Sequence, residues 1–274
     1  MKTIGLKMRF KTFISLVIIL ALFIKCGKDK VTTNFNRLGD YVQISLSTKD
    51  LDQSLSFYKK LGFKEIDERR NGTVPWALLS DGMFMFMISQ HDFPSPTLIY
   101  YGENSDKRIQ ILQSRGVSFD TIFYDPKGNT TAITTDPNLL NITIINFNTN
   151  KLPAPSGNSY CILGQFKEVI IPTDNLENSI NFWQKAGFSK KDMGGTSYLN
   201  VTLTDGLIKI GLHQNKKYIN FAFSYFTENI DEVINRLQEI DITKKVESTD
   251  DGRITGVFLK SPDNQLFYIK EIVP

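Results

Sequence analysis

The sequence predicts an α+β protein made of two tandem copies of one domain. Three observations lead to this fold class: a sequence repeat at an interval of 125 residues, an alternation between strand and helix periodicity within each copy, and an Asp-Gly turn at corresponding places in both copies. The chain has 274 residues, of which 41% are hydrophobic and 22% charged. This composition is typical of a folded globular protein, and the length allows two ordinary domains.

The repeat is clearest in one segment of each copy. The pattern Leu-x-x-Ser-x-x-Phe-Tyr-x-x-Leu-Gly-Phe at residues 51–63 recurs as Leu-x-x-Ser-x-x-Phe-Trp-x-x-Ala-Gly-Phe at residues 176–188. A Pro- and Gly-containing stretch, Leu-Pro-Ala-Pro-Ser-Gly, then separates the copies, as expected of a linker. We therefore predict a first domain at residues 39–150, a linker at 151–160 and a second domain at 161–274.

Periodicity assigns the elements within each copy. Residues 41–47 alternate between apolar and polar side chains, as in a strand with one buried face, and residues 50–61 carry a helical apolar stripe that ends at Gly62. Asp81-Gly82 is a two-residue hairpin signal. The same criteria predict helices at 50–61, 106–115, 176–186 and 230–239, and strands at 41–47, 76–79, 83–88, 97–101, 142–147, 166–171 and 221–225, with shorter strands around Ile122, Ala132, Val201, Ile208, Val257 and Phe267.

The first 25 residues are typical of an export signal. They hold a basic start and an apolar run at residues 13–24, whose twelve residues would span about 18 Å as a helix against a hydrocarbon core of about 30 Å. The run leads to Cys26 without an A-x-A cleavage site, which resembles a bacterial lipoprotein signal. The resemblance implies a lipid on Cys26, a tether at residues 26–38 and a protein exported to the cell envelope. Lys25 occupies a position that favours a small residue in such signals, so an uncleaved anchor is the alternative.

Charge and cysteine content exclude other classes of partner. Five basic residues and no acid precede residue 26, so the nominal charge of +3 becomes −2 for the rest of the chain. This balance gives no reason to expect a nucleic-acid partner. Two Cys and two His make a zinc cage improbable, and Cys161 is expected to be a small buried side chain.

The repeated patterns at 51–63 and 176–188, together with Asp136-Pro137-Asn138 and the segment 261–265, resemble the vicinal oxygen chelate superfamily of glyoxalases, bleomycin resistance proteins and extradiol dioxygenases. The resemblance covers about residues 39–149 and 164–273. It implies that each copy contains two βαβββ modules, which form a cupped mixed sheet with the helices outside. It also implies that the functional site lies in the cup.

The resemblance implies a divalent metal held by His, Gln or Glu at fixed positions of the cup strands. In this sequence those positions hold Gln43, Thr97 and Thr143, with Met85 or Met87, in the first copy, and Glu168, Ala222 and Tyr268, with Lys209 or Gly211, in the second. Each cup thus keeps one plausible ligand, whereas a catalytic divalent ion takes three or more protein ligands. We therefore predict no metal, no cofactor and no catalytic residue.

The cups could still bind a ligand. Met85 and Met87 alternate on one strand and should face the first cup beside Gln43 and Ser45, where flexible thioethers suit an apolar or aromatic molecule. A closed core filled by methionine is an equally good interpretation. In the second cup we predict that Lys209 pairs with Glu168, unless both reach solvent at the rim, and His213 lies in register with Lys209.

The sequence therefore favours a lipid-anchored envelope protein of glyoxalase-like fold that binds a small molecule or a protein without metal. Two alternatives stay open: a metal-dependent lyase or dioxygenase whose ligands lie elsewhere, and a structural lipoprotein whose cups are filled by side chains. The metal content of the protein and the openness of the cups at Gln43 and Glu168 separate the three.

Overall fold

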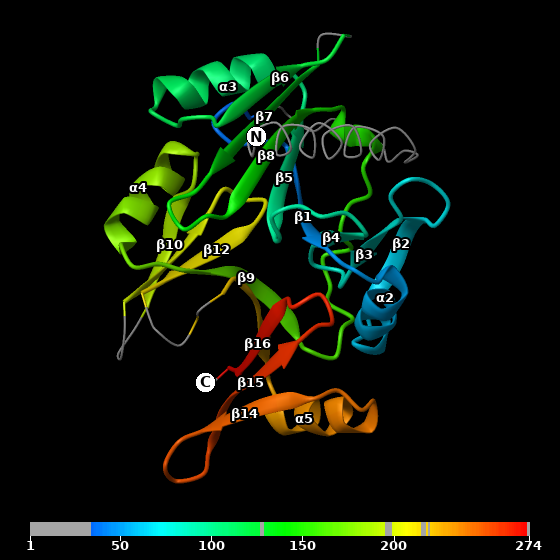
Figure 1. The fold of residues 1–274 in the computed structure, drawn as a ribbon. Helices are drawn as coiled ribbons and strands as arrows, with labels where there is room; N and C mark the ends of the chain where they lie inside the picture. Colours follow the sequence, from blue (N-terminus) through cyan, green and yellow to red (C-terminus); the bar gives the residue numbers. More distant parts are fainter. Residues whose placement is uncertain (1–33, 127–128, 195–198, 215–217, 219, 273–274) are drawn as a thin grey trace, which may run out of the picture.

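The structure is a computed structural model that describes residues 34–126, 129–194, 199–214, 218 and 220–272. The predicted export signal, Cys26 and most of the tether lie outside these residues. The described residues form two sheets of eight strands, one in each copy of the repeat (Figure 1). Among the described residues, no helix is long and apolar enough to cross a membrane.

The first sheet has the strand order β2-β3-β4-β1-β5-β8-β7-β6. Its strands are β1 (Tyr41–Ser47), β2 (Lys64–Arg69), β3 (Trp76–Ser80), β4 (Met85–Ser89), β5 (Thr97–Gly102), β6 (Thr121–Tyr124), β7 (Thr130–Thr135) and β8 (Asn141–Asn146). Helix α2 (Leu51–Lys60) follows β1, and helix α3 (Ser105–Ser114) follows β5. A short 3₁₀ helix, η1 (Thr149–Lys151), leads to the second copy.

The second sheet repeats this arrangement in the order β10-β11-β12-β9-β13-β16-β15-β14. Its strands are β9 (Gln165–Pro172), β10 (Ser189–Gly194), β11 (Asn200–Thr204), β12 (Lys209–His213), β13 (Ala222–Thr227), β14 (Lys244–Ser248), β15 (Ile254–Lys260) and β16 (Leu266–Glu271). Helices α4 (Leu176–Lys185) and α5 (Ile230–Glu239) follow β9 and β13.

Each sheet consists of two βαβββ modules joined at their first strands. In the first copy β1 pairs with β4 in parallel and with β5 in antiparallel orientation, and β5 pairs with β8 in parallel. Alternation along β1 sends Ile44 and Leu46 into the main core, which also contains the buried faces of the helices. The opposite face of the sheet, which carries Gln43 and Ser45, is called the cup face below.

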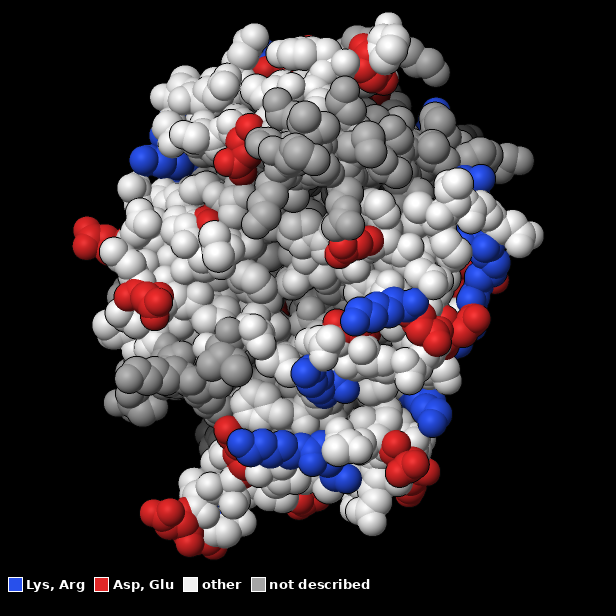
Figure 2. All heavy atoms as spheres, in the orientation of Figure 1, with Lys and Arg blue, Asp and Glu red and all other residues white. Residues whose placement is uncertain are grey.

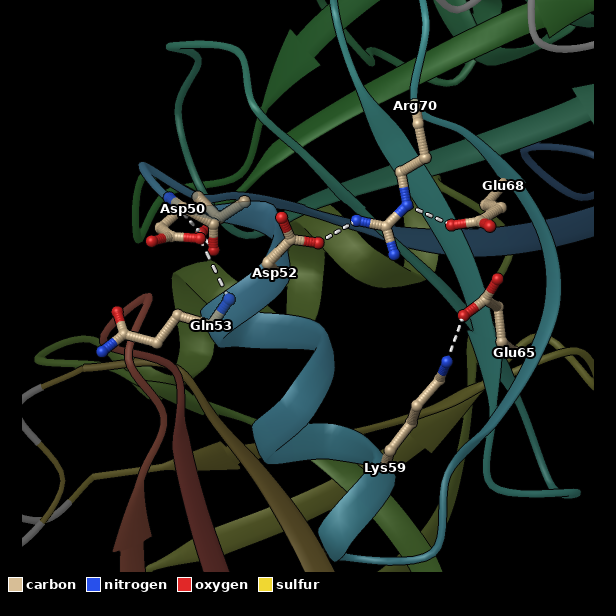
Figure 3. Close-up of polar contacts among 8 residues, drawn as sticks. Asp50, Asp52, Gln53, Lys59, Glu65, Glu68 and Arg70 are labelled. Carbon is tan, nitrogen blue, oxygen red and sulfur yellow. Dashed lines mark hydrogen bonds and ion pairs between the residues drawn. The ribbon is translucent and has the colours of Figure 1, made fainter.

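Local sequence signals set both ends of helix α2. Asp50 caps its N-terminus by accepting a hydrogen bond from the backbone N–H of Gln53 at 3.0 Å (Figure 3). Gly62 ends the helical segment with a φ of +92°, in the left-handed region that favours glycine. Lys59 of the helix pairs with Glu65 of β2 at 2.6 Å, which ties the helix to the edge strand (Figure 3).

The two copies share one core. Phe84 of the first copy packs against Phe166 of the second, with ring centroids 4.2 Å apart, and the largest apolar cluster contains residues of both sheets. Helix α2 also contacts the other copy, because Tyr58 donates a hydrogen bond to Asp263 at 3.0 Å. Reciprocally, Trp183 of α4 donates to Asp136 of the first copy at 3.2 Å. The copies are therefore interlocked by buried polar contacts as well as by apolar packing.

The predicted fold class and helices are confirmed, and Cys161 is buried as expected. Three strands carried no signal in the sequence: β2, β10 and β14. All three lie at sheet edges, where β2 and β14 carry exposed or partly exposed charged side chains instead of an apolar alternation.

Acidic and basic side chains lie interspersed on the face of the molecule in Figure 2, so this face offers no continuous basic surface.

Candidate functional site

The first cup face is largely apolar. The structure places Gln43, Ser45, Met85 and Met87 together on it, as the alternation in β1 and β4 predicts. The surrounding apolar side chains, which pack as one cluster, are Val74, Trp76, Leu78, Met85 and Met87, with Tyr41 at their edge. Gln43 is only 4% exposed. The first cup is thus a buried apolar region that contains a few polar groups.

Three of these polar groups are unsatisfied. Tyr41 Oη, Gln43 Nε2 and Ser45 Oγ are buried and have no hydrogen-bond partner among the described residues. They alternate on one strand and therefore lie on the same face of the sheet. A buried polar group without a partner costs about 1–3 kcal/mol, so water or ligand atoms that pair with these three groups would stabilise this face.

Strand register corrects one assignment in this cup. Gln43 lies opposite Ile99 on β5, and Ile99 lies beside Thr143 on β8. Thr97, which the sequence grouped with Gln43, lies opposite Ser45 instead, and its hydroxyl donates to the carbonyl of Pro94 at 2.6 Å. Thr97 therefore stays on the cup face, in the row of Ser45, and the hydropathy pattern of β5, which is buried on both faces, does not reveal this register.

Glu168 lies in the corresponding cup of the second copy. It is 2% exposed and accepts a hydrogen bond from the hydroxyl of Thr202 at 2.8 Å. Its other carboxylate oxygen lies 3.3 Å from Nε2 of His213 and 3.9 Å from the ammonium of Lys167. Glu168 is therefore a well-partnered carboxylate.

Because Gly211 has no side chain, Glu168 and His213 can approach each other. Gly211 lies between Lys209 and His213 on β12, and a Cβ atom there would come within 2.5 Å of the Glu168 carboxyl carbon and 2.7 Å of His213 Nε2. Only glycine leaves room for the two side chains to meet. Beside them Tyr218, Phe258 and Tyr268 form an aromatic wall, in which the rings of Phe258 and Tyr268 stack at 4.6 Å.

The predicted pair of Lys209 and Glu168 is wrong. Lys209 lies at the start of β12, and its exposed side chain lines a cleft between the two copies. His213, four residues further along the same strand, takes the predicted role of partner to Glu168. Tyr268 lies in the same row as Glu168, because Ser224 of β13 pairs with Glu168 on one side and with Tyr268 on the other. Ala222 pairs with Ile170 instead, so it lies two residues away from its predicted place.

The pKa of Glu168 reflects competing effects. Burial would raise it, but the hydrogen bond from His213, the charges of Lys167 and His213 and the hydrogen bond from Thr202 outweigh burial and lower the pKa. Glu168 is therefore a carboxylate at neutral pH.

A bulge in β9 sets the direction of this side chain. Pairing between β9 and β13 runs from Glu168 opposite Ser224 to Phe166 opposite Tyr225, which leaves Lys167 as an extra residue. The bulge lets Phe166 enter the shared core while Glu168 stays on the cup face. Thr202, Tyr218 and Phe258 were not predicted as site residues, and Tyr218 follows a strand end where periodicity gives no signal.

Comparison with solved structures identifies the fold. The chain is similar to a catechol 2,3-dioxygenase, with a TM-score of 0.56, 11% sequence identity and coverage of 86% of this chain and 88% of that chain. It is also similar to the Mn(II)-bound glyoxalase from Novosphingobium aromaticivorans, with a TM-score of 0.54, 13% identity and coverage of 84% and 80%. A 2,3-dioxygenase from Pseudomonas sp. KL28 gives a TM-score of 0.55, 14% identity and coverage of 89% and 94%.

No protein-family model matches the sequence, and a search of curated proteins finds no match either. The structural similarity covers both copies and extends over most of each neighbour. The chain therefore has the vicinal oxygen chelate fold, as two tandem copies of eight strands each.

The residues of the two cups do not fit the metal that this fold implies. The central row of the first cup holds Gln43, Ile99 and Thr143, and that of the second holds Glu168, Ser224 and Tyr268. Each row supplies one strong donor, and His213 adds a second in the second cup. Within the described part of the chain, no group of three His, Cys, Asp or Glu residues could hold a metal ion.

Proposed function

We propose that this chain is a binding protein of the vicinal oxygen chelate fold that takes up a small apolar or aromatic molecule in its first cup and performs no metal catalysis. The unpartnered amide nitrogen of Gln43, buried on the sheet face that also carries Met85 and Met87, is the observation that supports this function. A ligand with one acceptor oxygen would satisfy that nitrogen, and its apolar part would contact the thioethers.

Three features of the first cup agree with an apolar ligand of this kind. The unsatisfied atoms are an amide N–H and two hydroxyls, so they would bind a neutral acceptor without a charge. The methionines can adjust to ligands of different shape. Tyr41 lies at the edge of both apolar clusters on this face, and burial raises the pKa of its hydroxyl, which therefore stays protonated as a donor.

Metal analysis and native mass spectrometry test the non-catalytic assignment. Protein purified without chelator should contain well below one equivalent of zinc, nickel, iron or manganese per chain, and it should retain an organic molecule or take one up on addition. About one equivalent of metal per chain, with an activity that a chelator removes and metal restores, would instead establish a lyase or dioxygenase.

We also propose that the protein is anchored in the cell envelope through a lipid on Cys26. The basic start, the apolar run at residues 13–24 and the absence of another cleavage site support this anchor. Cys26→Ser should move the protein from the detergent phase to the aqueous phase in a detergent partition. Cys161→Ala is the control and should stay in the detergent phase, because the Cys161 side chain is buried. Unchanged partition of Cys26→Ser with an intact leader would contradict the lipid anchor.

A further inference from the structure

We infer that the cleft between the two copies is a second binding site, which takes a small aromatic anion such as a carboxylate. Residues of β1 and β9 line the cleft, which has a volume of about 240 Å³. Both strands lie near the centre of the molecule in Figure 1. The hairpin turns β3–β4 and β11–β12 form its other walls. It adjoins the first cup, because Tyr41 and Met85 border both, whereas Gln43 and Glu168 do not line it.

The cleft is built from corresponding residues of the two copies. Ten of its lining residues form five pairs at corresponding positions of the sequence repeat, with one member of each pair from each copy. The corresponding pairs are Tyr41 and Phe166, Val42 and Lys167, Met83 and Leu207, Phe84 and Ile208, and Met85 and Lys209.

The two sides of the cleft differ in charge. Where the first copy has Val42 and Met85, the second has Lys167 and Lys209. All the other pairs are apolar on both sides. A molecule lying across the cleft would therefore place an apolar part against the first copy and an anionic group near the second.

Lys209 is the cation available to such a ligand. Its side chain is exposed at the start of β12, and it forms no ion pair with any residue that the structure describes. Lys167, by contrast, already lies 3.9 Å from Glu168 and 4.2 Å from the ring of Phe226. The acid of the cleft, Asp40, is neutralised by Arg108 at 2.8 Å. The cleft thus keeps an uncompensated positive charge.

The floor and the volume limit the ligand. Phe84 and Phe166 pack at 4.2 Å and provide an aromatic surface. At about 30 Å³ per water molecule, a volume of about 240 Å³ corresponds to roughly eight waters. That space suits one or two fused rings with a single carboxylate and is too small for a long lipid chain.

A binding experiment with a charged probe and its neutral counterpart tests this site. We would titrate the purified full chain with 2-naphthoate and with 2-naphthylmethanol, which has the same rings without the charge. The wild type should bind 2-naphthoate more tightly, and Lys209→Met, which installs the residue of the first copy, should weaken 2-naphthoate about fivefold to tenfold with little effect on the alcohol. Raising the ionic strength should weaken 2-naphthoate binding to the wild type as well.

Two control variants make the result specific. Lys245→Met removes an exposed lysine of β14 and should bind 2-naphthoate like the wild type. Lys270→Met removes an exposed lysine of β16, outside the cleft and the cups, and should also bind 2-naphthoate like the wild type. Equal affinity for the two probes, or equal affinity of the wild type and Lys209→Met for 2-naphthoate, would overturn the proposal.

Discussion

The contacts of Glu168 in the second cup offset the energetic cost of burying its charge. The carboxylate lies between the hydroxyl of Thr202 at 2.8 Å and the imidazole of His213 at 3.3 Å, and Gly211 leaves the space in which they meet. These contacts together lower its pKa although burial acts in the opposite direction. A group with a lowered pKa in the folded state stabilises the fold at a pH above its ordinary pKa.

The pH dependence of Glu168→Gln tests this balance. Above the ordinary pKa of 4.5, the variant should lose about 1–3 kcal/mol of unfolding free energy, because an amide replaces a charged acceptor. As the pH falls through the folded pKa of Glu168, the wild type loses this contribution and the difference should shrink. Urea unfolding at pH 7 and pH 3.5 measures both values. If wild type and Glu168→Gln differ equally at the two pH values, Glu168 contributes no charge-dependent stability. The matched control is Glu239→Gln, at an exposed residue of α5.

At the scale of elements, the four α-helices of the described residues begin in two different ways. Asp50, Asn175 and Asn229 each have an extended backbone and accept a hydrogen bond at 3.0 Å from the N–H three residues on. Asn104, which precedes α3, has a φ of 56° and makes no side-chain cap. Three helices are therefore fixed by a cap, whereas the start of α3 holds a residue other than glycine in the left-handed region.

This contrast predicts opposite effects for two substitutions. Asn229→Ala should lower the free energy of unfolding by about 1 kcal/mol, because the backbone N–H of Glu232 loses its acceptor. Asn104→Gly should leave stability unchanged or raise it by a few tenths of a kcal/mol, because glycine adopts a positive φ without a steric cost. Denaturant unfolding of the two variants and the wild type measures both changes in unfolding free energy. A larger loss in Asn104→Gly than in Asn229→Ala would contradict this account of the helix starts.

At the scale of the whole molecule, three aspartates join the two copies, of which Asp81 and Asp136 are buried and Asp263 is half-buried. Asp81 accepts from Tyr225 at 2.9 Å, Asp136 from Trp183 at 3.2 Å and Asp263 from Tyr58 at 3.0 Å, and each pair crosses from one copy to the other. Burial raises the pKa of all three carboxyl groups, although the hydrogen bonds that they accept act against it. The aromatic residue at the same position of α2 and α4, Tyr58 or Trp183, thus bonds an aspartate of the other copy.

Tyr225→Phe should weaken the contact between the copies. Without the hydroxyl, the buried Asp81 carboxylate loses a donor, which should cost about 1–3 kcal/mol at neutral pH. Loss of the donor raises the pKa of Asp81 further, so the free energy of unfolding should fall more steeply as the pH rises from 3.8, the ordinary pKa of an aspartate. The destabilisation by Tyr225→Phe should therefore be smaller at pH 3. Thermal unfolding at both pH values measures it. Tyr124→Phe, at a side chain that is 71% exposed, is the control and should have no effect; an equally small effect of Tyr225→Phe would contradict the role of this bond.

Much of the fold could be predicted from the sequence because its patterns act locally. The alternation in β1 and the glycine after α2 fix elements without reference to the rest of the chain. Edge strands such as β2 escaped prediction, because an exposed strand needs no apolar face. The recurrence of the repeat then supplied the tandem arrangement.

The candidate site was harder to predict because it depends on register. Gln43 and the methionines were placed on one face by alternation alone. The partner of Glu168 was missed because the glycine that lets His213 approach, and the bulge at Lys167, act between strands far apart in sequence. Neither feature leaves a periodic signal in one strand.

The most direct test of the central claim compares two probes in the first cup. Acetophenone carries an acceptor oxygen for the amide of Gln43, and ethylbenzene lacks it. Calorimetry of the full chain should show that the wild type binds acetophenone more tightly, that Gln43→Leu loses this preference, and that Gln113→Leu, at an exposed glutamine of α3, retains it. Gln43→Leu should also raise the unfolding free energy of the ligand-free chain by about 1 kcal/mol, because a buried unsatisfied amide is removed. Absence of binding by both probes, or an unchanged preference in Gln43→Leu, would contradict a ligand site in this cup.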